Sequence, residues 1–379
     1  REKIEPLLRA MLEELERVVS IDSPTFPPAG TNAVAAHFTE RYSALGAEVE
    51  RVPGSQGTGD HMLARFQGKC AGGPRVALFG HCDTVFPEGE ASRRPFRIGG
   101  NLARGPGVVD MKGGLVTCYY ALKALLRAGF KEFGSIDILY DTDEERGNPS
   151  SRPLIEEIGK GVTAALILEP ARADGTLVSS RKGGIYGTLR VRGVPAHAGV
   201  DPNLGRSAVL ELANQIVRLA ALNGEEGSVN FSSLSGGDRP NIVAEYASCS
   251  VELRSDTQAT LDAMMKSLEK QIGTPALEGT HVSFDRSGGR PVMVMREETE
   301  KLIHVAGEVG KEVGVAVTHT ATGGGSDGNF LSTLRVPILD GLGPVGGKFH
   351  TDEEYLEISS LVPRTALLSG IIERLARAG

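Results

Sequence analysis

The hydrophobic pattern of this 379-residue chain changes twice, and those changes constrain its fold more than any other feature. From residue 1 to 181, amphipathic stretches at helical spacing alternate with short continuous apolar runs, which is typical of layered α/β folds. Between 182 and 291, alternating strand patterns are interleaved with helices, as in an α+β module. The first pattern returns over 292–379. We therefore predict a discontinuous α/β domain interrupted by an inserted α+β domain.

The expected elements follow from these patterns. Helices of the interrupted domain are expected over 4–20, 31–45 and 113–129. Four apolar runs predict central strands covered by helices on both faces, at 75–80, 135–141, 164–169 and 336–342. Helices of the inserted domain are expected over 205–222 and 257–272, and glycine-rich loops over 322–328 and 343–347.

Composition excludes several classes of protein. The net charge is -7, and no Lys/Arg-rich stripe offers the concentrated basic surface that nucleic acid requires. No apolar stretch approaches the roughly 20 residues of a membrane span. The four cysteines lack any CxxC spacing, so we expect reduced structural thiols at Cys70, Cys82, Cys118 and Cys249.

The first segment, residues 1–19, has the pattern of a charged amphipathic helix without a signal-peptide cleavage site. This predicts a cytoplasmic protein. Because Arg1 is not an initiator Met, removal of a secretory leader stays open.

Polar side chains with metal-binding potential follow the expected central strands. His81 follows the first run, Glu144 and Glu145 follow the second, Glu169 ends the third, and His350 lies beyond the fourth. The carboxyl ends of strands are where an open α/β sheet builds its site. Another carboxylate, Asp110, stands in a constrained turn rich in Gly and Pro, which could aim its side chain inward.

Two imidazoles and several carboxylates suit zinc or a similar divalent ion, and a bridging carboxylate would give a two-metal hydrolase site. Taken singly, a His or Glu after a strand is more often a cap or a surface group, and adjacent glutamates often begin a solvated helix. The convergence at several strand ends favours the metal site.

Six motifs occur in one order along the chain: GHCDTV, GPGVVDMKGG, DTDEERG, LEP, GVPAHAG and GKFHTDEE. In that order and spacing they resemble the M20 metallopeptidase family, most specifically its glutamate carboxypeptidase branch, over essentially the whole chain. The resemblance implies a zinc-exopeptidase-like catalytic domain, 1–181 and 292–379, with a ferredoxin-like lid and dimerisation domain at 182–291. It also implies a homodimer formed through that inserted domain.

The resemblance implies a ligand set as well. His81, Asp110 and Glu169 would hold one Zn²⁺, and Asp110, Glu145 and His350 the other, with Asp110 bridging. Co²⁺ or Mn²⁺ are possible substitutes. In the family the peptide bond after this Asp is cis, so a cis bond is expected between Asp110 and the next residue.

Further roles are implied by the same resemblance. Glu144 would be the general base, since a carboxylate beside the metals that is not itself a ligand can carry a proton. Asp83 would fix the tautomer of His81, although a turn-stabilising Asp is the alternative. His197 would reach the other subunit's active site and stabilise an oxyanion, whereas taken alone it would be a surface-loop residue.

The resemblance also implies a substrate-binding set, Asn241, Arg254 and Gly325, with Arg290 as a further candidate. Arg254 could clamp a carboxylate through two parallel hydrogen bonds, or it could be a surface partner of Asp256. Arg290 could meet an acidic substrate side chain.

The predicted function is hydrolysis of an amide bond next to a free carboxylate, by a carboxypeptidase that releases C-terminal glutamate from peptide or folate-like substrates. An N-acyl-amino-acid deacylase, acting on acetylornithine or succinyl-diaminopimelate, is the first alternative and would share every metal ligand. A non-catalytic binding protein of the same fold would be expected to lack the base or a ligand, and a phosphoesterase would need more basic side chains near the site.

Overall fold

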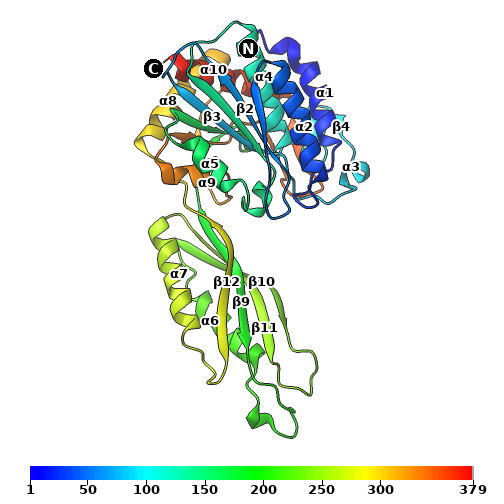
Figure 1. The fold of residues 1–379 in the computed structure, drawn as a ribbon, viewed down its shortest axis with the longest axis vertical. Helices are drawn as coiled ribbons and strands as arrows, with labels where there is room; N and C mark the ends of the chain where they lie inside the picture. The colour runs from blue at the N-terminus through cyan, green and yellow to red at the C-terminus, as the bar shows by residue number, and fades with distance from the viewer. Residues whose placement is uncertain (378–379) are drawn as a thin grey trace. The chain divides into compact units, whose positions relative to one another are not determined.

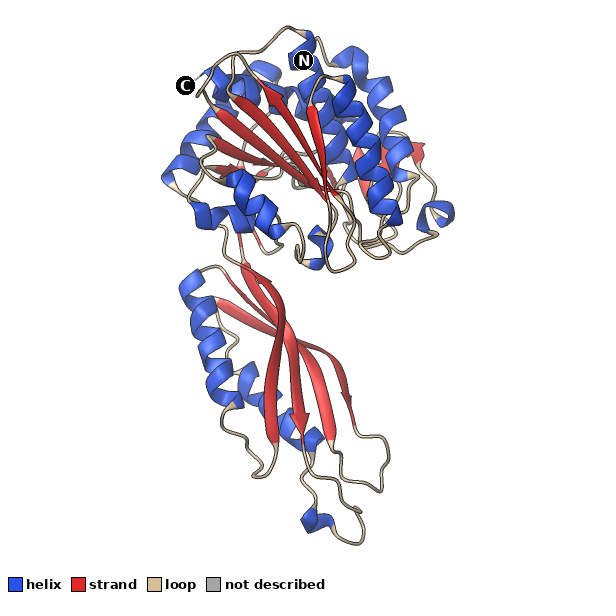
Figure 2. Cartoon of the chain, in the orientation of Figure 1, coloured by secondary structure: helices blue, strands red, loops and turns tan. Residues whose placement is uncertain are grey.

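The computed structural model describes residues 1–377, which form two compact units (Figures 1 and 2). The larger unit is α/β and comprises residues 1–180, 293–322 and the chain from 326 onward. The smaller unit comprises Arg181–Val292 and the loop Gly323–Gly325. That loop was expected in the returning part of the larger domain. It groups with the smaller unit because Arg181 Nη1 donates to the carbonyls of Gly324 and Gly325, at 3.0 and 3.2 Å.

The larger unit is built on one six-stranded sheet. Its strands, in spatial order, are β1 (Glu48–Val52), β2 (His61–Gln67), β6 (Ser135–Asp141), β3 (Arg75–His81), β7 (Ala164–Ile167) and β14 (Ile338–Leu339). The last four are parallel, whereas β1 and β2 pair antiparallel. Every residue of β6 and β7 is buried. Parallel strands covered on both faces need such continuous apolar sequences, which is why the apolar runs predicted them.

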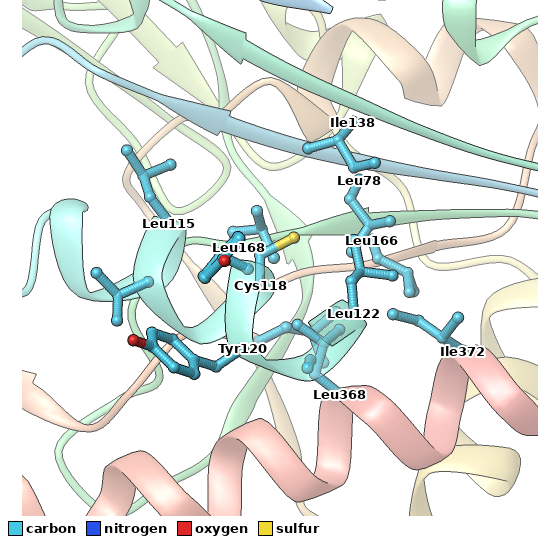
Figure 3. Close-up of a cluster of buried hydrophobic side chains, with 14 of the residues drawn as sticks. Leu78, Leu115, Cys118, Tyr120, Leu122, Ile138, Leu166, Leu168, Leu368 and Ile372 are labelled. Carbon is cyan, nitrogen blue, oxygen red and sulfur yellow. The ribbon is translucent and has the colours of Figure 1, made fainter. Parts of the chain in front are cut away.

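The helices of this unit are α1 (Leu8–Val19), α2 (Ala29–Ala44), α3 (Glu90–Arg93), α4 (Lys112–Arg127), α5 (Arg152–Gly159), α8 (Glu297–Val313), α9 (Gly328–Leu331) and α10 (Ile358–Arg377). All of them except the short α3 pack against that sheet or against one another (Figure 2). In Figure 3, Leu115, Cys118 and Leu122 of α4 lie between the sheet and Leu368 of α10. This packing fixes α4, which begins directly after the loop that carries Asp110.

The fourth predicted strand, 336–342, is wrong in both length and place. Only Ile338–Leu339 pair with β7, and β14 forms the edge of the sheet. Pro337 cannot donate a backbone N–H, and Gly341 turns the chain with a φ of 72°. Strand β1, at the other edge of the sheet, and its neighbour β2 were not predicted.

Two small sheets complete the larger unit. One has the order β15 (Gly346–Gly347), β16 (Tyr355–Glu357), β5 (Leu102–Arg104) and β4 (Arg97–Gly99), and the other pairs β8 (Leu177–Arg181) with β13 (His319–Thr322). The stretch 343–347, expected as a loop, therefore contains a short strand. Its partner β16 links the segment after His350 to β5.

The smaller unit has the element order β9 (Gly183–Arg192), α6 (Ala208–Ala220), β10 (Gly227–Gly236), β11 (Tyr246–Ser255), α7 (Gln258–Ile272) and β12 (His281–Arg290). Its antiparallel sheet has the strand order β10-β11-β9-β12. Both helices contact β9 and β11 and each other, around a separate hydrophobic core. This order is that of a ferredoxin-like βαββαβ unit.

All four cysteines are free; Cys82, Cys118 and Cys249 are buried, whereas Cys70 is exposed. Among residues 1–377, no helix combines the length and the apolar composition that a membrane span needs.

Candidate metal centre

Five potential metal ligands of the larger unit come together at the carboxyl ends of the central strands. His81 is the last residue of β3, Glu169 lies two residues after β7, and Glu145 lies in the 3₁₀ turn Glu144–Arg146 that follows β6. Asp110 comes from the loop between β5 and α4, and His350 from the loop between β15 and β16. The sheet thus gathers residues that are up to 269 positions apart, from His81 to His350, in the sequence.

These residues form two groups that share one carboxylate. In the first group, His81 Nε2 lies 3.5 Å from Asp110 Oδ1 and 3.7 Å from Glu169 Oε1. In the second, His350 Nε2 lies 3.3 Å from Asp110 Oδ2 and 3.5 Å from Glu145 Oε1. Within each group the ligand atoms lie within 4.8 Å of one another. Asp110 therefore presents one oxygen to each imidazole, as a bridging carboxylate would.

Asp83 holds the His81 ring in a defined orientation. His81 Nδ1 donates to the backbone oxygen of Asp83 at 2.9 Å and lies 3.3 Å from Asp83 Oδ1. The other carboxylate oxygen, Oδ2, accepts from Thr25 Oγ1 at 2.6 Å and from the backbone N–H of Glu145 at 3.2 Å. A proton on Nδ1 leaves the Nε2 lone pair of His81 for a metal ion.

The electrostatics of the cluster suit a cation. Hydrogen bonds to Asp110 and Glu145 raise the pKa of His350 to about 11. Burial alone would lower the pKa of His81, but hydrogen bonds to Asp110 and Asp83 raise it well above its usual range. Burial also raises the pKa of Glu145. The carboxylates thus hold positive charge on both imidazoles, and a divalent ion would take the place of those protons.

Glu144 lies beside this cluster without joining it. It is 9% exposed and begins the turn that also carries Glu145. Among residues 1–377, neither of the two groups of potential metal ligands includes Glu144. A buried carboxylate next to potential ligands has the placement expected of a proton carrier.

The loop that carries Asp110 has a constrained backbone. The Asp110–Met111 peptide bond is cis, which confirms the expectation drawn from the family resemblance. Gly107 has a φ of 68°, and a Cβ there would lie 2.5 Å from Thr84 Cγ2. Only glycine fits this position.

In the smaller unit, His197 and Asn241 lie on adjacent segments. The backbone N–H of Ala198 donates to the Asn241 carbonyl at 3.0 Å. His197 is exposed, and its Nδ1 accepts from the backbone N–H groups of Gly199 and Val200, both at 3.1 Å. Because Nδ1 is an acceptor, the neutral ring carries its proton on Nε2, which is then an exposed hydrogen-bond donor.

Arg254 contacts groups different from those expected. Its Nε donates to Glu252 Oε1 at 2.9 Å, and its Nη1 donates to the Gly323 carbonyl at 2.6 Å. The alternative pairing with Asp256 is wrong, since Asp256 lies 3.1 Å from Lys182 Nζ. The contact with Gly323 ties the guanidinium to the glycine loop, which was predicted to bind substrate through Gly325.

The remaining predicted substrate residue, Arg290, is the last residue of β12, and its register partner is Gly184. It is half-buried.

Sequence reasoning missed Glu354, whose side chain is fully buried and accepts backbone hydrogen bonds from the Asp110 loop. Burial raises its pKa to about 7. The residue belongs to the GKFHTDEE motif, where its acidic neighbours, Asp352 and Glu353, are exposed. Nothing in the local pattern distinguishes the buried carboxylate from its exposed neighbours.

Two groups of potential metal ligands that share a carboxylate thus lie at the strand ends of an α/β sheet. This arrangement is typical of hydrolases that use two metal ions. The chain belongs to peptidase family M20/M25/M40, whose model matches residues 77–374. It is therefore a hydrolytic enzyme of a metallopeptidase family.

Two curated relatives match nearly the whole chain. Carboxypeptidase G2 of Pseudomonas sp. (strain RS-16) is 31% identical over 370 residues, covering 96% of this chain and 88% of that protein. The succinyl-diaminopimelate desuccinylase of Alkalilimnicola ehrlichii is 27% identical over 383 residues, covering 96% and 98%. The relatives thus include both a carboxypeptidase and a deacylase.

Solved structures share the fold. A tripeptidase from Staphylococcus aureus has a TM-score of 0.79 at 23% identity and covers 98% of this chain and 99% of its own. A dinuclear metal-binding peptidase of family M20 from Bacillus subtilis has a TM-score of 0.70 at 15% identity, covering 98% and 99%.

Proposed function

We propose that the protein is a di-zinc hydrolase that cleaves an amide bond next to a free carboxylate, and that it acts as a carboxypeptidase releasing glutamate. One observation carries this proposal. Asp110 belongs to both sets of potential metal ligands, and it directs one carboxylate oxygen toward the histidine of each set. The similarity to a carboxypeptidase over 96% of the chain supports the reaction class.

The donor set fits zinc, since zinc takes imidazole nitrogen and carboxylate oxygen. His81, Asp110 and Glu169 would hold one ion, and Asp110, Glu145 and His350 the other, with Co²⁺ or Mn²⁺ as substitutes. Bound there, zinc would supply Lewis acidity for the scissile carbonyl.

The side chains of the protein would move the protons. Glu144 would accept a proton from the attacking water and return it to the leaving amine nitrogen. His197 would donate its Nε2–H to the oxygen of the former carbonyl as negative charge develops there. Asp83 would keep the proton of His81 on Nδ1, so that the ring cannot turn away from Asp110.

We expect the metal-free protein to take up two equivalents of zinc and to be inactive until it does. Titration of the chelated protein, with metal analysis after dialysis, measures the uptake, and amide hydrolysis measures the activity. Full activity after exhaustive chelation, or uptake of a single ion, would contradict a two-metal site.

Arg254 and Asn241 would grip the free carboxylate of the released residue. The Arg254 side chain is 39% exposed, and its guanidinium already donates to the carboxylate of Glu252. A substrate carboxylate would take the place of Glu252 on the same planar fork.

We therefore predict that Arg254→Lys lowers kcat/KM about 10- to 100-fold, because an ammonium group cannot reproduce the fork and one charge-assisted hydrogen bond is lost. Rates on a substrate ending in glutamate and on its α-amide should be compared in both proteins. The variant should lose activity only on the free acid. Arg190→Lys is the matched control, since Arg190 also pairs with a carboxylate on this sheet, that of Asp285 at 2.6 Å. Equal rates on acid and amide in the unmodified protein would refute the clamp.

A deacylase of N-acylated amino acids is the second candidate. Its support is the desuccinylase relative, which the match covers over 98% of its length. Both candidates use the same metal ligands, so only substrates separate them. Hydrolysis of N-succinyl-diaminopimelate or N-acetylornithine, without hydrolysis of dipeptides or folate-like glutamates, would favour the deacylase.

The smaller unit would form a homodimer. Helix α6 exposes Val209, Leu210 and Val217, at 42, 53 and 73%, although its other face packs on the sheet. Strand β10 forms one edge of that sheet and exposes Leu234 at 63%. In the proposed dimer, this apolar helix face and the open edge of β10 would pack against the same surface of a second copy.

A further inference from the structure

Glu354 is a buried carboxylate that accepts hydrogen bonds from the loop that carries Asp110. Its Oε2 accepts from the backbone N–H of Gly107 at 3.0 Å. Its Oε1 accepts from the N–H groups of Val109 and Asp110, at 2.9 and 3.1 Å. The side chain is 0% exposed. Three of the N–H groups in the loop Gly107–Asp110 therefore depend on this one carboxylate.

Glu354 also lies on the same short segment as His350. The turn between them is closed by backbone hydrogen bonds, from Thr351 to the Lys348 carbonyl and from Glu354 to the Thr351 carbonyl, both at 3.2 Å. The next residue, Tyr355, begins β16, and its register partner is Arg104, the last residue of β5. The segments that carry His350 and Asp110 are thus joined by a strand pair and by one carboxylate.

The outer side of this turn is anchored separately. Arg93 lies 2.9 Å from Asp352 Oδ2, and Arg94 Nη1 donates to the Asp352 carbonyl at 2.9 Å. Arg104 Nη1 donates to the Glu353 carbonyl at 2.9 Å. These contacts hold the turn in place and thereby fix the position of Glu354. The hydrogen bonds of Glu354 in turn fix the backbone of the Asp110 loop.

We propose that Glu354 is a positioning residue that holds Asp110 and His350 at the separation a metal ion requires. The proposal rests on the metal centre proposed above. Glu354 does not touch the ion or the substrate. It acts through the backbone of Asp110, whose carboxylate is shared by both donor groups, so both ions should depend on it.

The variant Glu354→Gln separates this role from simple burial. Glutamine keeps the size and one acceptor oxygen, but its NH₂ group faces a backbone N–H and leaves that donor unpaired. The Asp110 loop should shift, and affinity for zinc should fall about 10- to 100-fold, as is typical when a partner behind a metal ligand is lost.

The chain offers a matched control in Glu211→Gln. Glu211 is also 0% exposed, and it accepts from the backbone N–H groups of Ala276 and Leu277, at 3.1 and 2.7 Å. It belongs to the smaller unit, whereas the metal ligands belong to the larger one. Glu211→Gln should lower the stability of the fold without changing the affinity for zinc.

The test is zinc affinity, measured by competition with a chromophoric chelator, together with the visible absorption spectrum of the Co²⁺-loaded proteins. We expect weaker zinc binding and an altered Co²⁺ spectrum for Glu354→Gln, and unmodified values for Glu211→Gln. Unchanged affinity and spectrum in folded Glu354→Gln would overturn the positioning role. Failure of the unmodified protein to bind two ions would instead overturn the metal centre itself.

A second variant covers the case in which Glu354→Gln does not fold. Glu354→Asp keeps the charge but shortens the side chain by one methylene, so the carboxylate cannot reach all three N–H groups. Weakened zinc binding by folded Glu354→Asp would support the proposal, and unmodified binding would overturn it. If neither variant folds while Glu211→Gln does, Glu354 is a folding residue and the proposal is wrong.

Discussion

Replacing Glu144 by Gln should lower kcat about 10²- to 10⁴-fold, because the amide keeps the shape of the side chain but cannot accept the proton of the attacking water. Glu144 is 9% exposed and belongs to neither donor group within residues 1–377, so its loss should leave the bound metal in place. The expected result is therefore a collapse of turnover with an unaltered metal content.

The measurement needs both quantities from the same sample, kcat by amide hydrolysis and metal by elemental analysis. Glu145→Gln is the matched variant, because this neighbour lies 3.5 Å from His350 Nε2 and is a proposed ligand. It should lose metal affinity along with activity. Retained turnover in Glu144→Gln would move the role of the base to another residue.

Removing the imidazole of His197 should have an effect of similar size. His197→Ala should lower kcat about 10²- to 10³-fold, the usual cost of losing one donor to a developing oxyanion. The variant should still bind two metal ions, since every proposed ligand belongs to the larger unit. His281→Ala is the control, because His281 is another exposed histidine of the smaller unit. It should keep full activity.

Mixing the two inactive variants tests whether His197 acts in the partner subunit. Equal amounts of exchanging His197→Ala and Glu144→Gln chains would form about half heterodimers, each with one site containing both intact groups, so about a quarter of the activity should return. No recovery despite proven subunit exchange would place His197 at the site of its own chain. A monomer in light scattering would exclude the cross-subunit role.

Much of the fold could be predicted because its signals are local. The run at 135–141 coincides with β6, and the run at 75–80 is one residue shorter than β3. Continuous apolar sequence of that length has few uses other than a covered parallel strand. The ends of each predicted helix differ by at most four residues from the ends of the observed helix. This agreement is expected because helical periodicity is a property of the segment itself.

The potential ligands could also be predicted, since each follows a recognisable strand or a motif in the sequence. Parallel strands bring their carboxyl ends to one edge of the sheet, so strand order alone places His81, Glu145 and Glu169 together. The roles proposed for these residues await the experiments above.

Other features were decided only by tertiary structure. The edge position of β14, the hydrogen bond from Arg254 to the Gly323 carbonyl, and the attachment of Gly323–Gly325 to the smaller unit each depend on segments distant in the sequence. Glu354 is the clearest case. It stands in a run of acidic residues, and only the pairing of β16 with β5 buries its carboxylate against the N–H groups of the Asp110 loop. Burial and hydrogen bonding at such a position are properties of the folded chain, because its contact partners lie about 245 residues away, from Glu354 to Val109.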